Sequence, residues 1–224
     1  MSRVEAGWVP VPRVGSARAR LWLGAALLLL AGLTATAPRA QDGAATRTVE
    51  TLHAALARNM AEGAALGLEG RLERLRPVLS EVFDFETITK VALGDAYATL
   101  DVPTRARFRA LLERMSAITY ADNFKSQQDE VRFVTVAEQA ARGERVVVRT
   151  RLERSNGEPV ALDYVVQRTP AGPRIVNVLA EGVSDLSLKR AQYAAVIRSD
   201  GVMGLLERIE TQVTELARAA VEGG

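Results

Sequence analysis

The sequence contains no cysteine and only one histidine among its 224 residues. The missing cysteine excludes disulfide bonds, thiol catalysis and thiolate-bound zinc, and it also excludes the lipid-modified cysteine of a bacterial lipoprotein. A metal site or a Ser-His-Asp triad would have to use His53. Because His53 lies between Leu52 and Leu56 on a predicted helix, we interpret it as a packed or surface residue instead.

Sequence signatures of hydrolases and nucleotide-binding proteins are also missing. The chain has no G-x-S-x-G, no G-x-x-x-x-G-K-[ST] and no G-x-G-x-x-G segment. Two carboxylates, Asp84 and Glu86, stand at a predicted helix start, where the helix dipole alone favours negative charge. The sequence therefore predicts neither catalytic residues nor a metal or cofactor site.

An excess of positive charge is missing from the body of the chain. The whole sequence has 29 basic and 27 acidic side chains. Removing the five arginines and one glutamate of residues 1–40 leaves 24 basic and 26 acidic residues, a formal charge of −2. This balance, without a basic stripe interleaved with aromatic residues, excludes nucleic acid as a partner.

The first 40 residues have the pattern of an export signal. Arginines precede an apolar run over residues 21–33, and Ala35-Thr36-Ala37 is an A-x-A cleavage site, with a second candidate at Ala40. An uncleaved membrane anchor is the alternative, although the run is short against the ~20 residues that a spanning helix needs. Both alternatives place the rest of the chain outside the cytoplasm, and we expect it in the periplasm.

Apolar residues at helical spacing surround a block of alternating residues. They predict helices over residues 49–60, 72–82, 85–93, 103–124, 188–196 and 202–216. Asp84 and Ser184 are predicted N-caps, and Asp200-Gly201 is predicted to separate the last two helices. Strands are predicted over residues 131–136, 145–152, 160–168 and 174–179.

The register of the central hairpin follows from its two faces. A three-residue loop with Gly157 at positive φ pairs Leu152 with Val160 and Val148 with Tyr164, which leaves one face apolar. The other face then pairs Arg149 with Asp163. An acid beside a tyrosine occurs in some small cup-shaped enzymes, but in this register Asp163 points away from the apolar face, so we interpret it as a structural ion-pair partner.

These elements predict an α+β fold: N-terminal helices, a four-stranded antiparallel curved sheet, then C-terminal helices. We expect one domain over residues 42–218 and a flexible tail over residues 219–224.

Several segments resemble, in the right order, the MlaC (toluene-tolerance) family of phospholipid carriers. They are Phe83-Asp84-Phe85-Glu86-Thr87-Ile88 through Val91-Ala92-Leu93-Gly94, Ile118-Thr119-Tyr120-Ala121, Val148-Arg149-Thr150-Arg151, Leu162-Asp163-Tyr164 and Glu181-Gly182-Val183-Ser184. The likeness covers roughly residues 48–210. Residues 67–71, 159–164 and 184–190 are closer to the hopanoid-associated HpnM branch, and Leu188-Lys189-Arg190 replaces the Asn-Tyr-Arg step usual in the main family.

The resemblance implies a cup of helices on a curved sheet that shuttles a phospholipid or a hopanoid between inner and outer membranes. The implied partners are an inner-membrane ABC transporter with a substrate-binding ring and an outer-membrane lipoprotein or porin; no cofactor is implied. A cup-fold enzyme acting on a polyprenoid and a hopanoid-associated adaptor are the alternatives. An enzyme would need a carboxylate of raised pKa inside the cavity, whereas an adaptor would have a filled core.

The predicted lipid cavity lies between the apolar face of the sheet, the long helix and the helices that flank them. Its expected lining is Leu93, Leu111, Met115, Ile118, Val146, Val148, Leu162, Tyr164, Val166, Tyr193 and Ile197.

Overall fold

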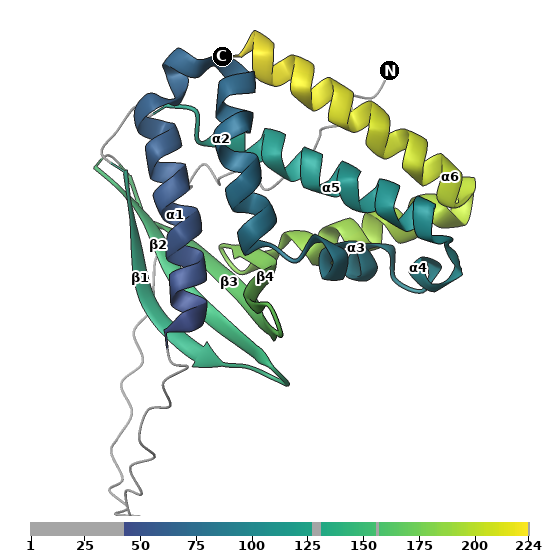
Figure 1. The fold of residues 1–224 in the computed structure, drawn as a ribbon, viewed down its shortest axis with the longest axis horizontal. Helices are drawn as coiled ribbons and strands as arrows, with labels where there is room; N and C mark the ends of the chain where they lie inside the picture. Colours follow the sequence, from purple (N-terminus) through teal and green to yellow (C-terminus); the bar gives the residue numbers. More distant parts are fainter. Residues whose placement is uncertain (1–42, 127–130, 156, 224) are drawn as a thin grey trace, which may run out of the picture.

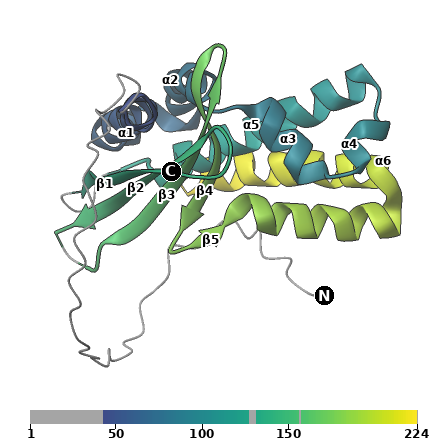
Figure 2. The same cartoon turned by 90° about the horizontal axis from the view of Figure 1, so that it is seen from below.

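The structure is a computed structural model that describes residues 43–126, 131–155 and 157–223. It is an α+β fold in which helices pack on an open antiparallel sheet (Figures 1 and 2). The predicted signal peptide, residues 1–40, lies outside the described residues, as does Asn156 in the hairpin turn.

The order of elements is the predicted one: helices, then strands, then a helical C-terminal part. The helices are α1 (Ala44–Glu62), the 3-10 helix η1 (Gly63–Leu66), α2 (Gly67–Val82), α3 (Phe85–Leu93), α4 (Ala96–Thr99), α5 (Val102–Asn123) and α6 (Asp185–Glu222). The strands are β1 (Val131–Ala140), β2 (Arg145–Arg154), β3 (Val160–Thr169), β4 (Gly172–Ala180) and β5 (Val183–Ser184).

The predicted helix caps are confirmed. One side-chain oxygen of Asp84 accepts a hydrogen bond from the backbone N–H of Thr87 at 2.9 Å, which fixes the start of α3. The hydroxyl of Ser184 accepts one from the backbone N–H of Ser187 at 3.1 Å at the start of α6. Each bond satisfies one of the backbone donors that a helix start leaves unpaired.

The sheet is a simple meander in the order β1-β2-β3-β4-β5. The predicted hairpin register is confirmed, because Leu152 lies opposite Val160 and Val148 opposite Tyr164. Gly157 has the expected positive φ, 137°. The prediction of four strands misses only β5, two residues that pair with the end of β4.

Helix α6 reverses its direction at Gly201, and its two arms diverge from that turn (Figure 1). Gly201 has φ 72° and ψ 179°, a backbone conformation outside the helical region. The predicted break at Asp200-Gly201 is therefore confirmed. Residues 219–222, part of the segment predicted as a flexible tail, belong to α6, which continues to Glu222, and Ala220 is buried in the core.

Helix α1 lies across the sheet and contacts β1, β2 and β4, while α2 and the first arm of α6 contact β4. Helix α5 packs on α2, α3 and α6, on the side away from β1 (Figure 1). The buried apolar side chains of these elements form one continuous core.

Candidate functional site

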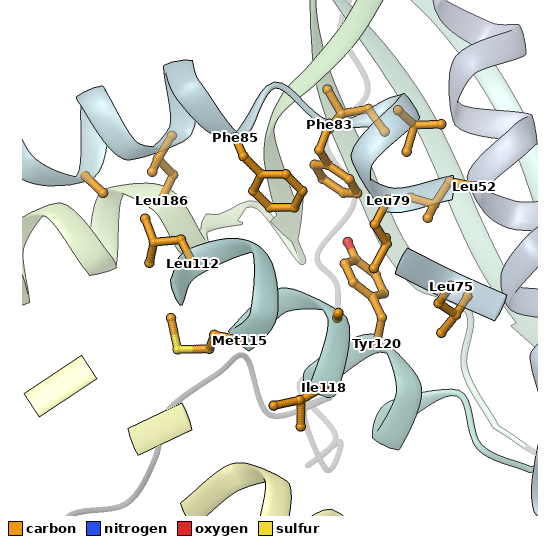
Figure 3. Packing of buried hydrophobic residues seen from close by; sticks show 14 of the residues in the cluster. Leu52, Leu75, Leu79, Phe83, Phe85, Leu112, Met115, Ile118, Tyr120 and Leu186 are labelled. Atoms are coloured by element: carbon orange, nitrogen blue, oxygen red, sulfur yellow. The ribbon is translucent and has the colours of Figure 1, made fainter. Parts of the chain in front are cut away.

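An apolar cavity of about 40 Å³ lies where α3, α5, β4 and the first turns of α6 meet. Its apolar walls are Phe83, Phe85, Ile88, Leu112, Tyr120, Val176, Val178 and Leu186, and its polar walls are Ser116, Asn177, Asp185 and Lys189. Figure 3 shows Phe83, Phe85, Leu112, Tyr120 and Leu186 gathered around this part of the core.

The junction between α2 and α3 holds Phe83 and Phe85 against the sheet. The backbone N–H of Asp84 donates to the carbonyl of Ile175 on β4 at 3.0 Å. The Phe83 ring lies 5.6 Å from the Phe85 ring and 5.8 Å from the Tyr120 ring, centroid to centroid. Aromatic contacts of this geometry favour a fixed mutual arrangement of the rings.

A β-bulge on β4 supplies the opposite wall. Val165 pairs with Asn177 and Val166 with Ile175, so Val176 is an extra residue with no partner in the ladder. Ile175 and Val176 are consequently both buried, against the usual alternation of strand residues. With this bulge in the strand, Val176 and Val178 both line the cavity.

The polar groups of the cavity are centred on an ion pair in the first turn of α6. The Nζ of Lys189 lies 2.7 and 2.9 Å from the two carboxylate oxygens of Asp185. Burial lowers the pKa of Lys189, and Asp185 opposes that shift. The phenol of Tyr120 is buried as well, and burial raises its pKa well above the usual value. The cavity thus combines apolar walls with polar side chains from α5, β4 and α6.

The residues predicted to line the lipid cavity all belong to the hydrophobic core. Those that are buried are Leu93, Met115, Ile118, Val146, Val148, Tyr164, Val166 and Tyr193, whereas Leu111, Leu162 and Ile197 are partly buried and pack against them. None of them lines the 40 Å³ cavity within the described part of the chain. Their role in lipid binding stays a prediction, because other residues line the cavity in the structure.

Helix α1 lies over the sheet face that was predicted to meet the long helix. Over β3, the Nε2 of His53 lies 3.0 Å from the Tyr164 hydroxyl, and its ring stacks on Phe133 at 4.1 Å. Burial lowers the pKa of His53 to about 4, so the ring is neutral at pH 7. Glu50 precedes His53 at a spacing found in some metal sites, but its side chain is exposed on α1.

The interpretation of Asp163 is confirmed. Its carboxylate lies 4.0 Å from the Nε of Arg149, on the face of the sheet opposite Tyr164. Burial raises the pKa of Asp163, and Arg149 opposes that shift. This acid does not line the apolar cavity.

The walls contributed by Phe83, Phe85, Val176 and Val178 were not predicted from the sequence. The first two stand in the segment that carries the family resemblance, so a signal for them was present. The two valines belong to a strand that was predicted, but the bulge that aims both of them inward has no signature in the sequence.

Residues 43–126, 131–155 and 157–223 contain no group of three acidic or histidine side chains placed to hold a metal ion.

A sequence model of the MlaC protein matches residues 47–211. The chain belongs to the MlaC family. The matched span includes every residue that lines the cavity. None of the helices in the described ranges is both long and apolar enough to cross a membrane.

Solved structures support the MlaC assignment, and seven chains match in fold. One is the phospholipid-binding protein from Ralstonia solanacearum, solved in complex with a phospholipid. It is 25% identical in sequence, with a TM-score of 0.70, and the match covers 77% of this chain and 98% of that one. No curated protein matches this chain.

Proposed function

We propose that this chain is a periplasmic carrier that binds the acyl tails of a phospholipid inside its helical cup. The observation that carries the proposal is the apolar cavity between α3, α5, β4 and α6 in a chain of the MlaC family. The phospholipid complex of the Ralstonia solanacearum protein, which this chain matches over nearly the whole of that protein, supports the same cargo.

The free energy of lipid transfer explains why such a carrier needs a cavity and no catalytic group. A two-tailed phospholipid exposes about 30 methylene groups at ~0.8 kcal/mol each, so crossing water unprotected costs on the order of 20 kcal/mol. Covering the tails with apolar side chains removes that barrier.

Asp185, the acid in the cavity, is paired with Lys189, which favours a binding role over acid–base catalysis.

The cavity must widen to hold a lipid. A volume of about 40 Å³ accommodates only a few water molecules, whereas pockets for drug-sized ligands span about 300–1,000 Å³. The walls on α3 and on the first arm of α6 contact the sheet through β4. In our proposal these two helices separate from β4 as the tails enter, and the core residues predicted above then contact the tails.

The wider transport system is part of the same proposal. An inner-membrane ABC transporter with a substrate-binding ring and an outer-membrane lipoprotein or porin would exchange lipid with the carrier. The direction of transport would follow from the relative affinities of these partners. A hopanoid is the alternative cargo, on the basis of the segments closer to the HpnM branch.

Native mass spectrometry of the protein purified from the periplasm of a hopanoid-producing host, followed by lipid extraction, tests the proposal. We expect one phospholipid per chain. A stoichiometric hopanoid would change the cargo and keep the carrier. A protein that carries no lipid and also takes up none from vesicles would contradict the carrier function and favour an adaptor.

A further inference from the structure

A second, larger pocket lies on the other side of Phe83 and Phe85 from the apolar cavity. It has a volume of about 320 Å³ and is open to solvent. It lies between the end of α2, the start of α3, the first half of α5 and the β3–β4 turn. Phe83 and Phe85 line both spaces, so these two residues stand between an outer polar pocket and the inner apolar cavity.

The acids of the outer pocket already have hydrogen-bond donors. Asp84 accepts from the backbone N–H and the hydroxyl of Thr87, at 2.9 and 2.6 Å. Glu86 accepts from the phenol of Tyr97, and Glu113 accepts from the hydroxyl of Ser80.

The two arginines of the pocket differ from its acids in this respect. Arg109 on α5 is exposed and Arg174 on β4 is half-buried, and both line the outer pocket. Neither guanidinium makes a side-chain hydrogen bond or an ion pair with any residue in the ranges that the structure describes. Two guanidinium groups beside one pocket supply positive charge and N–H donors of the kind that a phosphate accepts.

We propose that the outer pocket binds the phosphate of the lipid head group through Arg109 and Arg174, and that the tails pass between Phe83 and Phe85 into the inner cavity. This inference rests on the proposed carrier function and adds the place of the head group and the path of entry. The head group would remain in water while the tails are covered. The junction between α2 and α3 would then be the mouth of the cup.

Lipid uptake by the full-length mature chain, stripped of lipid, tests the role of the arginines. The probes are vesicles that contain phosphatidylglycerol or diacylglycerol with the same tails, which differ in the presence of the phosphate. The double variant Arg109→Gln/Arg174→Gln should bind phosphatidylglycerol about tenfold more weakly, because it loses charge-assisted hydrogen bonds, and should bind diacylglycerol unchanged. Arg114→Gln, which removes one positive charge from an exposed position on α5 outside the pocket, is the control for each single variant, Arg109→Gln and Arg174→Gln.

The absence of natural cysteine allows a second test of the entry path. Ser80→Cys places a single thiol in the outer pocket, and Ser199→Cys places one on the exposed surface of α6. Labelling each thiol with a bulky maleimide should reduce uptake of both lipids several-fold at position 80 and leave uptake unchanged at position 199. The ratio of uptake before and after labelling removes any effect of the substitution itself.

Each of the following results would overturn the inference. If the double arginine variant loses uptake of both lipids equally, phosphate recognition is excluded. It is also excluded if Arg114→Gln loses as much phosphatidylglycerol uptake as the arginine variants of the pocket. Undiminished uptake after labelling at position 80 would exclude this entry path. If the wild-type chain takes up neither lipid, the proposed carrier function fails as well, whereas normal wild-type uptake with insensitive variants contradicts only the head-group site.

Discussion

The Nε2 of His53 on α1 and the hydroxyl of Tyr164 on β3 lie 3.0 Å apart, buried between the helix and the sheet. This contact joins the single histidine of the chain to the centre of the sheet and fixes the position of α1 over the strands. The imidazole is neutral there, because burial lowers the pKa of His53 to about 4.

Acidification should therefore destabilise the fold through His53. The unfolded chain binds a proton near pH 6.5, whereas the folded chain binds it only near pH 4, so stability falls as the pH drops between these values. We expect a loss of up to about 1.4 kcal/mol per pH unit and about 3 kcal/mol in all. Urea unfolding at pH 7, 6 and 5 measures the slope. His53→Gln should flatten it, and an equal slope in that variant would show that other groups cause the effect.

Glu138 on β1 caps the start of α1. Its carboxylate accepts from the backbone N–H of Thr46 at 3.1 Å, from the Thr46 hydroxyl at 2.6 Å and from the backbone N–H of Gly43 at 3.3 Å. Burial tends to raise the pKa of Glu138, but these hydrogen bonds outweigh burial and lower it.

Glu138→Ala should consequently lower the free energy of unfolding by about 1 kcal/mol, as for the loss of an N-cap. Glu138→Gln should lose less, since an acceptor oxygen remains. Chemical denaturation at pH 7 measures both changes, with Glu158→Ala at an exposed position as the control. Equal effects of the Glu138 and Glu158 substitutions would argue against a capping role.

Gly201 permits the reversal of α6, since its φ of 72° with ψ of 179° belongs to a region that is open almost only to glycine. Gly201→Ala should therefore destabilise the fold by about 1–3 kcal/mol. Ser199→Ala, two residues earlier on the exposed surface, should change stability by less than about 0.5 kcal/mol. Thermal unfolding of both variants gives the comparison. Similar melting temperatures would mean that the reversal tolerates a side chain.

Two substitutions distinguish which part of the core receives the lipid tails. Leu162 represents the sheet face predicted from sequence, whereas Val178 lines the cavity described here, and both are partly buried. If the tails begin in the cavity, Val178→Trp should block lipid co-purification. Leu162→Gln should block it only if the tails extend over the sheet face. Lipid extraction from folded protein, verified by circular dichroism, measures both, and retained lipid in Val178→Trp would contradict the cavity as the binding site.

The local features of this chain were predicted correctly from the sequence because residues close together in the chain determine them. The alternation of apolar and charged residues in β2 and β3 leaves one register with a single apolar face, and the structure has that register. Asp84 and Ser184 cap their own helices through residues three positions away. The break at Gly201 follows from the conformational freedom of one residue.

Contacts between distant segments were not predicted from the sequence. The sequence predicted the first helix from residue 49, yet α1 begins at Ala44, because Glu138 caps it from a strand more than 90 residues away. The position of α1 over the sheet face was not predicted either, since it depends on how whole helices pack.

The sequence by itself determined the α+β class, the hairpin register, the helix caps and the family of this protein, because each follows from local pattern or from ordered motifs. Only the tertiary structure decided where the cavity lies. Phe83 and Phe85 face Val176 because a backbone hydrogen bond ties the α2–α3 junction to β4 and because a bulge turns that strand. Both effects arise from packing between segments that lie far apart in the chain, and no local pattern encodes them.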